Sequence, residues 1–376
     1  MVAERAFWLA WSQIYGIGPT LLNRLQAHFG TLAAAWQATP TQLGTVEGFG
    51  DQSIKKVMQE RSRLEPEALF QQHIAKNPHF WTPADPDYPR LLLEIPTLPP
   101  LLYYRGNVQL QENQGIKPTI GIVGTRDPSD YGRKWTRRIT TALVKKGFTI
   151  VSGMAEGIDT EAHRACLEAG GRTLAVLGTG VDVVYPPRNQ GLYENIQQHG
   201  LILSEYPAGT QPDRAHFPRR NRIIAGLSRA VLVMEAPSKS GALITAHLAN
   251  DFCRDVYVLP GSLDNPKAMG CLGLLSKGAH MILSEGHLLD MLGAIPQLDA
   301  VEPQQLQLFN PAPSPPVPDL PSELKQVLGA IASEATPFDV VVQQAGLATG
   351  TVSSALLELE LRGLVSQLPG MRYQRS

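Results

Sequence analysis

Cationic side chains gather in one short stretch of the sequence, where they surround an aromatic residue. Residues 214–222 include Arg214, His216, Phe217, Arg219, Arg220, Asn221 and Arg222. Arginines neutralise phosphates and an aromatic face stacks on a base, so this pattern is typical of a protein that binds single-stranded nucleic acid. The alternative is a solvated loop whose buried arginines pair with Glu205 and Glu235, Arg222 being the first candidate for that structural role.

A turn rich in glycine and serine follows the cationic stretch. The apolar run Ala230–Met234 predicts a buried parallel strand, and residues 238–245, Ser-Lys-Ser-Gly-Ala-Leu-Ile-Thr, lead from it into a helix. Backbone amides in an open turn before a helix are suited to holding phosphate groups. The stretch 216–245 is therefore the predicted working site.

Another arginine follows the first predicted strand. The run Gly121-Ile-Val-Gly124-Thr-Arg126 lacks the G-x-G-x-x-G pattern of dinucleotide-binding turns. Arg126 can instead clamp a phosphate through its planar guanidinium group, or it can simply pair with Asp127 or Asp130. The next predicted helix carries a basic stripe made of Arg133, Lys134, Arg137 and Arg138. That stripe is either a solvated face or an extension of a phosphate track.

Carboxylates also follow several predicted strands, so an enzyme is a competing interpretation. The candidates are Glu156, Asp159 with His163, Asp182, Glu205 and Glu235. Two neighbouring carboxylates could act as general acid and base. However, Asp159 can cap a helix, Glu205 and Glu235 can hold arginines, and neither a P-loop nor a Ser–His–Asp order is present. Catalysis is the weaker hypothesis.

The elements that must position these residues alternate between strands and helices. Short apolar or β-branched runs predict strands at 120–123, 149–151, 173–177, 201–204, 230–234 and 256–259, with helices such as 131–146, 159–169 and 242–252 between them. Such alternation predicts an α/β fold, a Rossmann-like, doubly wound and mostly parallel sheet over residues 118–295. Ligands of such folds bind beyond the carboxyl ends of the strands, where the polar motifs fall.

Both flanks of this domain have their own patterns. Residues 1–75 predict a helical domain, helix-hairpin-helix or SAM-like, with Gly-rich turns at 16–19 and 47–50; the alternative is a small bundle with glycines at its turns. Residues 76–117, rich in proline and aromatic residues, predict an ordered connector packed on the core.

The C-terminal part begins with a proline-rich stretch. Residues 296–321 predict a linker, and residues 322–376 predict three helices and a hairpin, the order of a winged helix. This last segment is slightly acidic, with four Lys and Arg against five Asp and Glu. Because binding to phosphates requires the reverse, a protein-contact role is favoured for it.

Composition sets further limits. The chain has 376 residues and a net charge of −1, so no global field attracts nucleic acid and any binding must come from local patches. The three cysteines are scattered, which fits a reducing compartment, and the irregular spacing of Cys253, Cys271, His280 and His287 argues against a metal site. No signal peptide and no membrane-spanning stretch of ~20 apolar residues is expected, so a cytoplasmic location is predicted.

Taken together, the motifs of the central domain resemble those of the DNA-processing protein A family (DprA, also called Smf). They are 121–126, Tyr131-Gly132, 150–159 with Ala162-His163, 174–182 with Tyr185-Pro186, 203–209, 217–228, Glu235-Ala236, 239–245 and Pro260-Gly261. Each is weak alone, but their common order is specific. The helical N-terminal part and the winged-helix tail also match the longer members of that family.

The resemblance implies a non-catalytic protein without cofactor or metal. Members of the family bind single-stranded DNA in natural transformation, protect it, load the RecA recombinase onto it, and form homodimers through the Rossmann-like domain. The implied DNA-binding residues are Gly124, Thr125, Arg126, Arg214, Phe217, Arg220, Asn221, Arg222, Lys239, Ser240 and Gly241.

Two positions depart from the family pattern, and two other functions compete. Glu156 stands where a basic residue is frequent, and Leu272 stands where an asparagine is usual. The first competing function is a Rossmann-type phosphoribohydrolase acting on nucleoside monophosphates, but the turn 239–245 continues as Ala-His-Leu and lacks the catalytic glutamate of those enzymes. The second is a scaffold whose tail recruits partners.

Overall fold

The computed structural model describes residues 3–293, 320–331, 336–368 and 371–375. The chain forms two compact units, Met1–Ala300 and Val301–Ser376. The predicted linker 296–321 lies almost entirely outside the described residues.

A nine-stranded sheet organises the described part of the first unit, in the order β1-β2-β6-β5-β4-β3-β7-β8-β9. The strands from β6 to β9 run parallel, while β1 and β2 extend the sheet in the antiparallel sense. Their bounds are β1 Phe80–Trp81, β2 Leu102–Gly106, β3 Thr119–Val123, β4 Thr149–Ser152, β5 Thr173–Leu177, β6 Leu201–Ser204, β7 Ala230–Val233, β8 Asp255–Val258 and β9 His280–Met281. The α/β, mostly parallel fold is confirmed.

The strand order reverses at β3. From β3 the chain builds outward through β4, β5 and β6 on one side, and through β7, β8 and β9 on the other. The carboxyl ends of β3 and β7 therefore form the topological switch point, where sheets of this kind bind their ligands.

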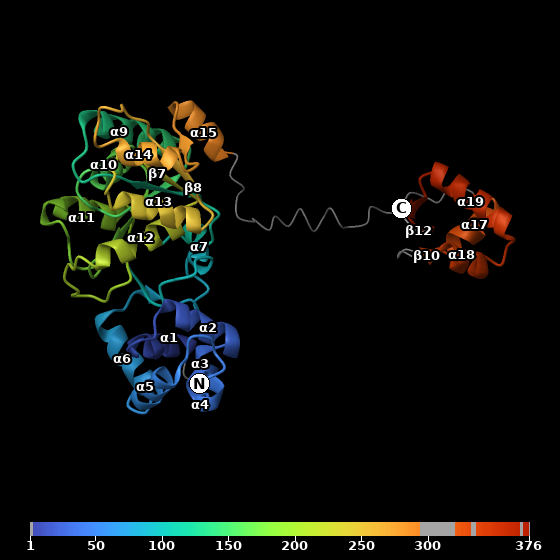
Figure 1. Cartoon of the computed structure of the whole chain (residues 1–376), viewed down its shortest axis with the longest axis horizontal. Coiled ribbons are helices and arrows are strands. Elements are labelled where there is room, and N and C mark those ends of the chain that lie inside the picture. Colours follow the sequence, from blue (N-terminus) through green and yellow to red (C-terminus); the bar gives the residue numbers. More distant parts are fainter. Residues whose placement is uncertain (1–2, 294–319, 332–335, 369–370, 376) are drawn as a thin grey trace. The chain divides into compact units, whose positions relative to one another are not determined.

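Helices cover both faces of the sheet (Figure 1). In chain order they are α9 Asp130–Lys145, α10 Ile158–Glu168, α11 Gln190–His199, α12 His216–Leu227, α13 Ala242–Asp251, α14 Met269–Leu275 and α15 Glu285–Gly293, with a 3₁₀ turn at Pro187–Asn189.

The side chains of β3 alternate between the two faces of the sheet, and each face has its own buried cluster. Ile120 and Ile122 belong to one buried cluster, which also holds Ile139 of α9. Val123 belongs to another cluster, which holds Ile223 of α12. Successive side chains of a strand point to opposite faces, so every residue of β3 is buried between two helical layers.

Six short helices form the N-terminal part of the same unit (Figure 1, blue). They are α1 Glu4–Gln13, α2 Pro19–Phe29, α3 Leu32–Gln37, α4 Pro40–Leu43, α5 Asp51–Arg61 and α6 Pro66–Lys76. Trp11 is fully buried and packs edge-on against Trp36, 5.2 Å between ring centroids. Gly18 and Gly50 precede α2 and α5, so the predicted Gly-rich breaks lie where helices begin.

The segment between these helices and the sheet is ordered. It contains β1, β2 and two short helices, α7 Arg90–Leu93 and α8 Leu110–Asn113. Trp81 of β1 stacks on Tyr104 of β2 with ring centroids 4.0 Å apart. The segment expected to act as a connector thus contributes the last two strands at one end of the main sheet.

The second unit has a core of its own. Its described elements are α17 Ser322–Gly329, β10 Thr336–Pro337, α18 Phe338–Ala345, α19 Thr349–Leu361, β11 Val365–Leu368 and β12 Arg372–Arg375. The three strands pair antiparallel in the order β10-β12-β11, and the buried cluster includes Val327, Val352 and Leu356. Three helices with a small sheet agree with the predicted winged helix.

In the described chain, no single helix has both the length and the apolar character needed to cross a membrane. The pair α18 and α19, which is bent by 109° between its two helices, satisfies the same criteria when taken together.

Candidate nucleic-acid interface

The loop after β3 presents Arg126 at the carboxyl edge of the sheet. The Thr125 N–H donates to the Glu235 carbonyl at 2.7 Å, and the Thr125 carbonyl accepts from Ile158 N–H at 3.1 Å. A Cβ on Gly124 would lie 2.5 Å from Ile158, so this close approach requires glycine. The loop is thus held on both sides while the Arg126 side chain stays exposed.

In the described chain Arg126 pairs with neither Asp127 nor Asp130, the two carboxylates that would give it a purely structural role. Asp127 pairs instead with Lys267, whose Nζ lies 2.7 Å from Oδ2 and lowers the pKa of that carboxyl. Within the described residues Arg126 has no carboxylate partner, and its guanidinium carbon lies 5.7 Å from the centroid of the Phe217 ring. Its charge therefore remains available to an anion.

Helix α12 contains most of the cationic stretch, and its residues lie on different sides of the helix. Phe217, Arg220 and Asn221 are spaced by three and four residues, so they share one side of the helix. All three line the same cleft. Arg222 lies on another side, is buried, and forms an ion pair with Glu205.

Arg220 forms the floor of the cleft. Its side chain is buried, and its Nη1 donates to the carbonyl oxygens of Gly153 at 2.7 Å and of Val176. The guanidinium group thereby ties the carboxyl ends of β4 and β5 together. Burial lowers the pKa of Arg220 to about 10, although the nearby Asp159 carboxyl opposes the shift. Arg220 stays charged at neutral pH.

The turn before α13 forms the other side of the cleft. Asn221 Nδ2 donates to the Gly241 carbonyl at 3.3 Å, which links α12 to this turn. Ser240 and Gly241 line the cleft, whereas Lys239 is exposed outside it.

These elements enclose one open cleft of about 640 Å³. Every DNA-binding residue implied by the sequence lines it except Arg222 and Lys239. A smaller pocket of about 70 Å³ adjoins it, bounded by Gly178, Tyr185 and Phe217. The aromatic rings of Tyr185 and Phe217 lie 5.4 Å apart, centroid to centroid.

Tyr185 and Ile244 are lining residues that sequence reasoning left out of the site. Tyr185 is 38% exposed and Ile244 is 40% exposed, both high for large apolar side chains. Tyr185 belongs to a motif that resembles the family, which was the signal available. Ile244 is one apolar residue in a helix, and nothing in the sequence marks it.

Comparison with known proteins decides the family. Residues 79–293 match the model of DNA recombination-mediator protein A, and residues 311–371 match that of the DprA winged helix domain. The chain is 54% identical to protein Smf of Synechocystis sp., over 99% of both chains. It belongs to the DprA/Smf family.

Solved structures of DprA agree. DprA from Streptococcus pneumoniae superposes with a TM-score of 0.66 at 34% identity, covering 78% of this chain and 99% of the other. The Helicobacter pylori protein, described for its single-stranded DNA binding mode, gives a TM-score of 0.51 at 30% identity, covering 57% and 95%. The family recognised from the sequence is confirmed, and its description as a recombination mediator agrees with the non-enzymatic class expected.

Two of the carboxylates considered as catalytic candidates are held by hydrogen bonds within the fold. Asp159 is buried and accepts hydrogen bonds from the amides of Gly153 and Ala155, at 3.1 and 3.4 Å. Burial raises its pKa to about 6, although Arg220 and these hydrogen bonds oppose the shift. Glu235 accepts from the amide and hydroxyl of Ser129 at 2.7 and 2.8 Å, and so holds the start of α9 rather than an arginine.

The two departures from the DprA pattern are modest in structural terms. Glu156 lines the smaller pocket but pairs with Arg188, which offsets its charge toward a polyanion. Leu272 lies on α14, half-buried and outside the lining of the cleft. In the described residues, no group of three His, Cys, Asp or Glu could hold a metal ion.

The basic stripe of α9 is largely neutralised. Arg133 and Arg137 both contact Glu161, at 3.5 and 2.6 Å, and Arg138 contacts Glu285 at 2.6 Å. The solvated-face interpretation fits this stripe better than a phosphate track does.

Proposed function

We propose that the chain binds single-stranded DNA in the cleft at the carboxyl edge of its sheet. The observation that carries this proposal is the placement of Arg126, an exposed arginine without a carboxylate partner in the described chain, beside the ring of Phe217. The guanidinium group supplies a donor for a phosphate, and the ring supplies a stacking face for the neighbouring base.

A single strand suits this cleft better than a duplex. Phe217 is half-buried and Tyr185 is partly exposed, so both offer ring surface to an unstacked base. The bases of a duplex already stack on one another and would have to be extruded to reach the rings. The single-stranded DNA binding mode described for the related Helicobacter pylori protein supports the same choice.

We further propose that the bound strand is protected and passed to the RecA recombinase in the cytoplasm during natural transformation. The description of the family as a recombination mediator supports this step. Three free cysteines fit a reducing compartment.

The same proposal includes a homodimer formed through the Rossmann-like domain. The edge strand β9 is exposed, and large apolar side chains lie in it and directly after it: Met281 is 41% and Leu283 67% exposed. An exposed strand edge with apolar side chains beside it is a surface that proteins commonly cover with another chain.

The proposal is tested by binding fluorescent oligo-dT and a matched duplex to the full chain and to Arg126→Ala. We expect preference for the single strand, and a loss of about 1–3 kcal/mol in the variant, the scale of a charged hydrogen bond. Arg164→Ala is the matched control, because Arg164 is exposed on α10 and does not line the cleft.

Affinity should also fall as salt is raised, since bound phosphates release counterions. Equal effects of the two substitutions, or binding that ignores salt, would contradict the proposal. Arg220→Ala is a poor probe, because the buried Arg220 supports two carbonyl groups and its loss would disturb the fold.

A further inference from the structure

A second cavity lies at the opposite edge of the parallel sheet, where strands begin. It has a volume of about 800 Å³, larger than the cleft, and residues just ahead of β4, β5 and β6 line it, among them Phe148, Arg172 and His199. None of its lining residues belongs to the DNA cleft. Nothing in the proposed function uses this cavity.

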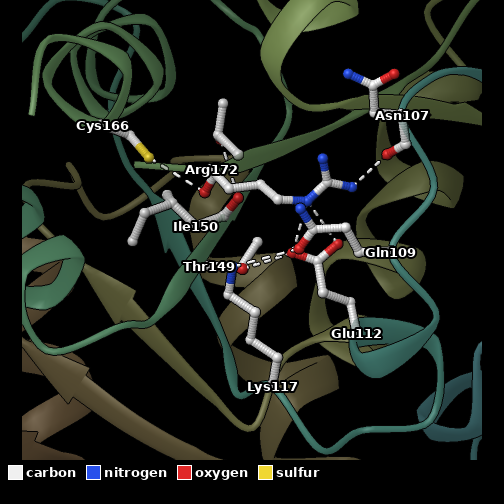
Figure 2. Close-up of polar contacts among 9 residues, drawn as sticks. Asn107, Gln109, Glu112, Lys117, Thr149, Ile150, Cys166 and Arg172 are labelled. Carbon is white, nitrogen blue, oxygen red and sulfur yellow. Dashed lines mark hydrogen bonds and ion pairs between the residues drawn. The ribbon is translucent and has the colours of Figure 1, made fainter. Parts of the chain in front are cut away.

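Its floor contains a buried, pre-organised arginine (Figure 2). Arg172 is 7% exposed, and its Nε lies 2.8 Å from both carboxylate oxygens of Glu112. Thr149 Oγ1 donates to the same carboxylate at 2.6 Å, and Arg172 Nη2 donates to the Asn107 carbonyl. The guanidinium group is therefore held by a buried carboxylate, which Thr149 holds in turn, and by the backbone of the exposed Asn107.

One end of this guanidinium group has no partner within the part of the chain that the structure describes. Among the described contacts none engages Arg172 Nη1, and in Figure 2 this nitrogen points away from Glu112. Lys117, a second lining cation, contacts Gln109 Oε1 at 3.4 Å and has no carboxylate partner in the described residues. Two cationic donors thus face one cavity, an arrangement that suits a phosphate group.

The rest of the lining suits a nucleobase. Asn195 and Gln198, three residues apart on α11, present side-chain amides that make no hydrogen bond within the described chain, and Glu168 adds an acceptor. Amide side chains pair with the edges of bases that carry an exocyclic amino group, adenine above all. The half-buried Phe148 provides an apolar ring surface on which a base can lie.

The edge also limits how much negative charge the cavity accepts. Helices α9, α10 and α11 all end here, capped at Lys146, Ala169 and Gly200. Their terminal carbonyls and the Glu168 carboxylate repel anions. Lys117 supplies a positive charge and Arg172, whose charge Glu112 balances, supplies a hydrogen-bond donor, so the lining suits one phosphate rather than a run of phosphates.

We propose that this cavity binds a single nucleotide with an amino-bearing base, its phosphate on Lys117 and Arg172 and its base against Phe148 and the amides of α11. Adenosine monophosphate combines such a phosphate with such a base. Its source is either a free nucleotide or the phosphorylated 5′ end of a DNA strand. The site is separate from the cleft, so its failure would leave the proposed function untouched.

Calorimetric titration of the full chain with adenosine monophosphate tests the site. We expect one bound nucleotide per chain, at least about tenfold weaker binding in Lys117→Met, and no binding in Asn195→Trp, where an indole fills the cavity. Two controls should bind like the wild type: Glu194→Trp, an exposed neighbour on α11 outside the lining, and Arg126→Ala in the cleft.

Thermal unfolding of the two tryptophan variants should coincide, because both positions are exposed. An oligo-dA with a 5′-phosphate that displaces the nucleotide would support the site and identify a strand end as its source; failure to displace would support a free nucleotide. Absence of binding to the wild type would overturn the proposal. So would binding lost in Arg126→Ala but kept in Lys117→Met.

Discussion

Arg126 and Arg220 differ in burial, and this difference decides what each can do for a bound strand. Arg126 is exposed, with no carboxylate partner among the described residues. Arg220 is buried, and its hydrogen bonds go to the carbonyls of Gly153 and Val176. In the proposed interface Arg126 meets the phosphate, while Arg220 shapes the floor and adds positive potential beneath it.

Asp159, a buried neighbour of Arg220, makes the free energy of unfolding depend on pH. Its pKa is raised to about 6 by burial, whereas an unfolded aspartate titrates near 3.9. Between these values the folded chain binds the proton more tightly than the unfolded chain does, so protonation stabilises the fold. This contribution, about 3 kcal/mol at most, is present below pH ~4 and is lost as the pH rises through ~6.

Comparing wild type with Asp159→Asn isolates that contribution. Their difference in unfolding free energy should change between pH ~4 and ~6 and be constant above. The comparison is needed because the buried His163 also titrates. Burial lowers its pKa to about 3, so it destabilises the fold as the pH falls below the pKa of free histidine, opposite to the effect of Asp159. A difference that does not vary with pH would show that Asp159 titrates normally.

The residue types of the candidate site could be predicted from the sequence, but their burial could not. The arginines, Phe217 and the Gly-Ser turn were recognisable from type and spacing. Arg222 was the first candidate for a structural pairing, and it pairs with Glu205, but the burial of Arg220 depends on the rotation of α12 against the sheet, which tertiary packing sets. Tyr185 joins the cleft through a loop that local pattern does not place.

At the scale of elements, long regular patterns were predictable and short edge elements were not. The predicted strand 173–177 coincides with β5, and the predicted helix 131–146 lies within one residue of α9. β1 and β9 have two residues each, too few to show alternation. β2 lies in a proline- and aromatic-rich segment whose pairing with β6 is a long-range contact that local sequence does not show.

The short helix α8 is tied to the sheet by the buried pair Glu112–Arg172. Their side chains are 2% and 7% exposed. Glu112→Gln would leave a buried guanidinium group without its counter-charge, so we expect a loss of about 3–5 kcal/mol in the free energy of unfolding. Urea denaturation measures this loss.

Glu47→Gln is the matched control for that experiment. Glu47 pairs with Arg24 at 3.2 Å, but its side chain is 85% exposed. An exposed pair contributes less than about 1 kcal/mol. Equal losses in the two variants would contradict the structural importance of the buried pair.

At the scale of the whole molecule, the two compact units have separate cores. The buried cluster of the winged helix contains residues from Leu320 onward and none from the first unit. We propose that the domain boundaries follow the sequence pattern, with the Rossmann-like part ending near residue 295.

A chain cut after residue 300 should therefore unfold at the same temperature as the corresponding transition of the full chain. It should also bind oligo-dT within a few-fold of the full chain, because the slightly acidic tail adds no neutralisation of phosphates. Calorimetry and fluorescence anisotropy measure the two quantities. Loss of binding in the shortened chain would assign the tail a direct part in holding DNA.

The most direct test of the central claim is to find where a bound strand touches the protein. Oligo-dT in which single thymines are replaced by 5-iodo-deoxyuridine forms photo-crosslinks to aromatic rings that stack on it, and mass spectrometry locates them. The proposed interface predicts crosslinks at Phe217 and Tyr185, whose rings border the cleft, and their loss in Phe217→Leu and Tyr185→Leu. Crosslinks confined to Tyr15 among the N-terminal helices, or to Tyr373 in the winged helix, would contradict it.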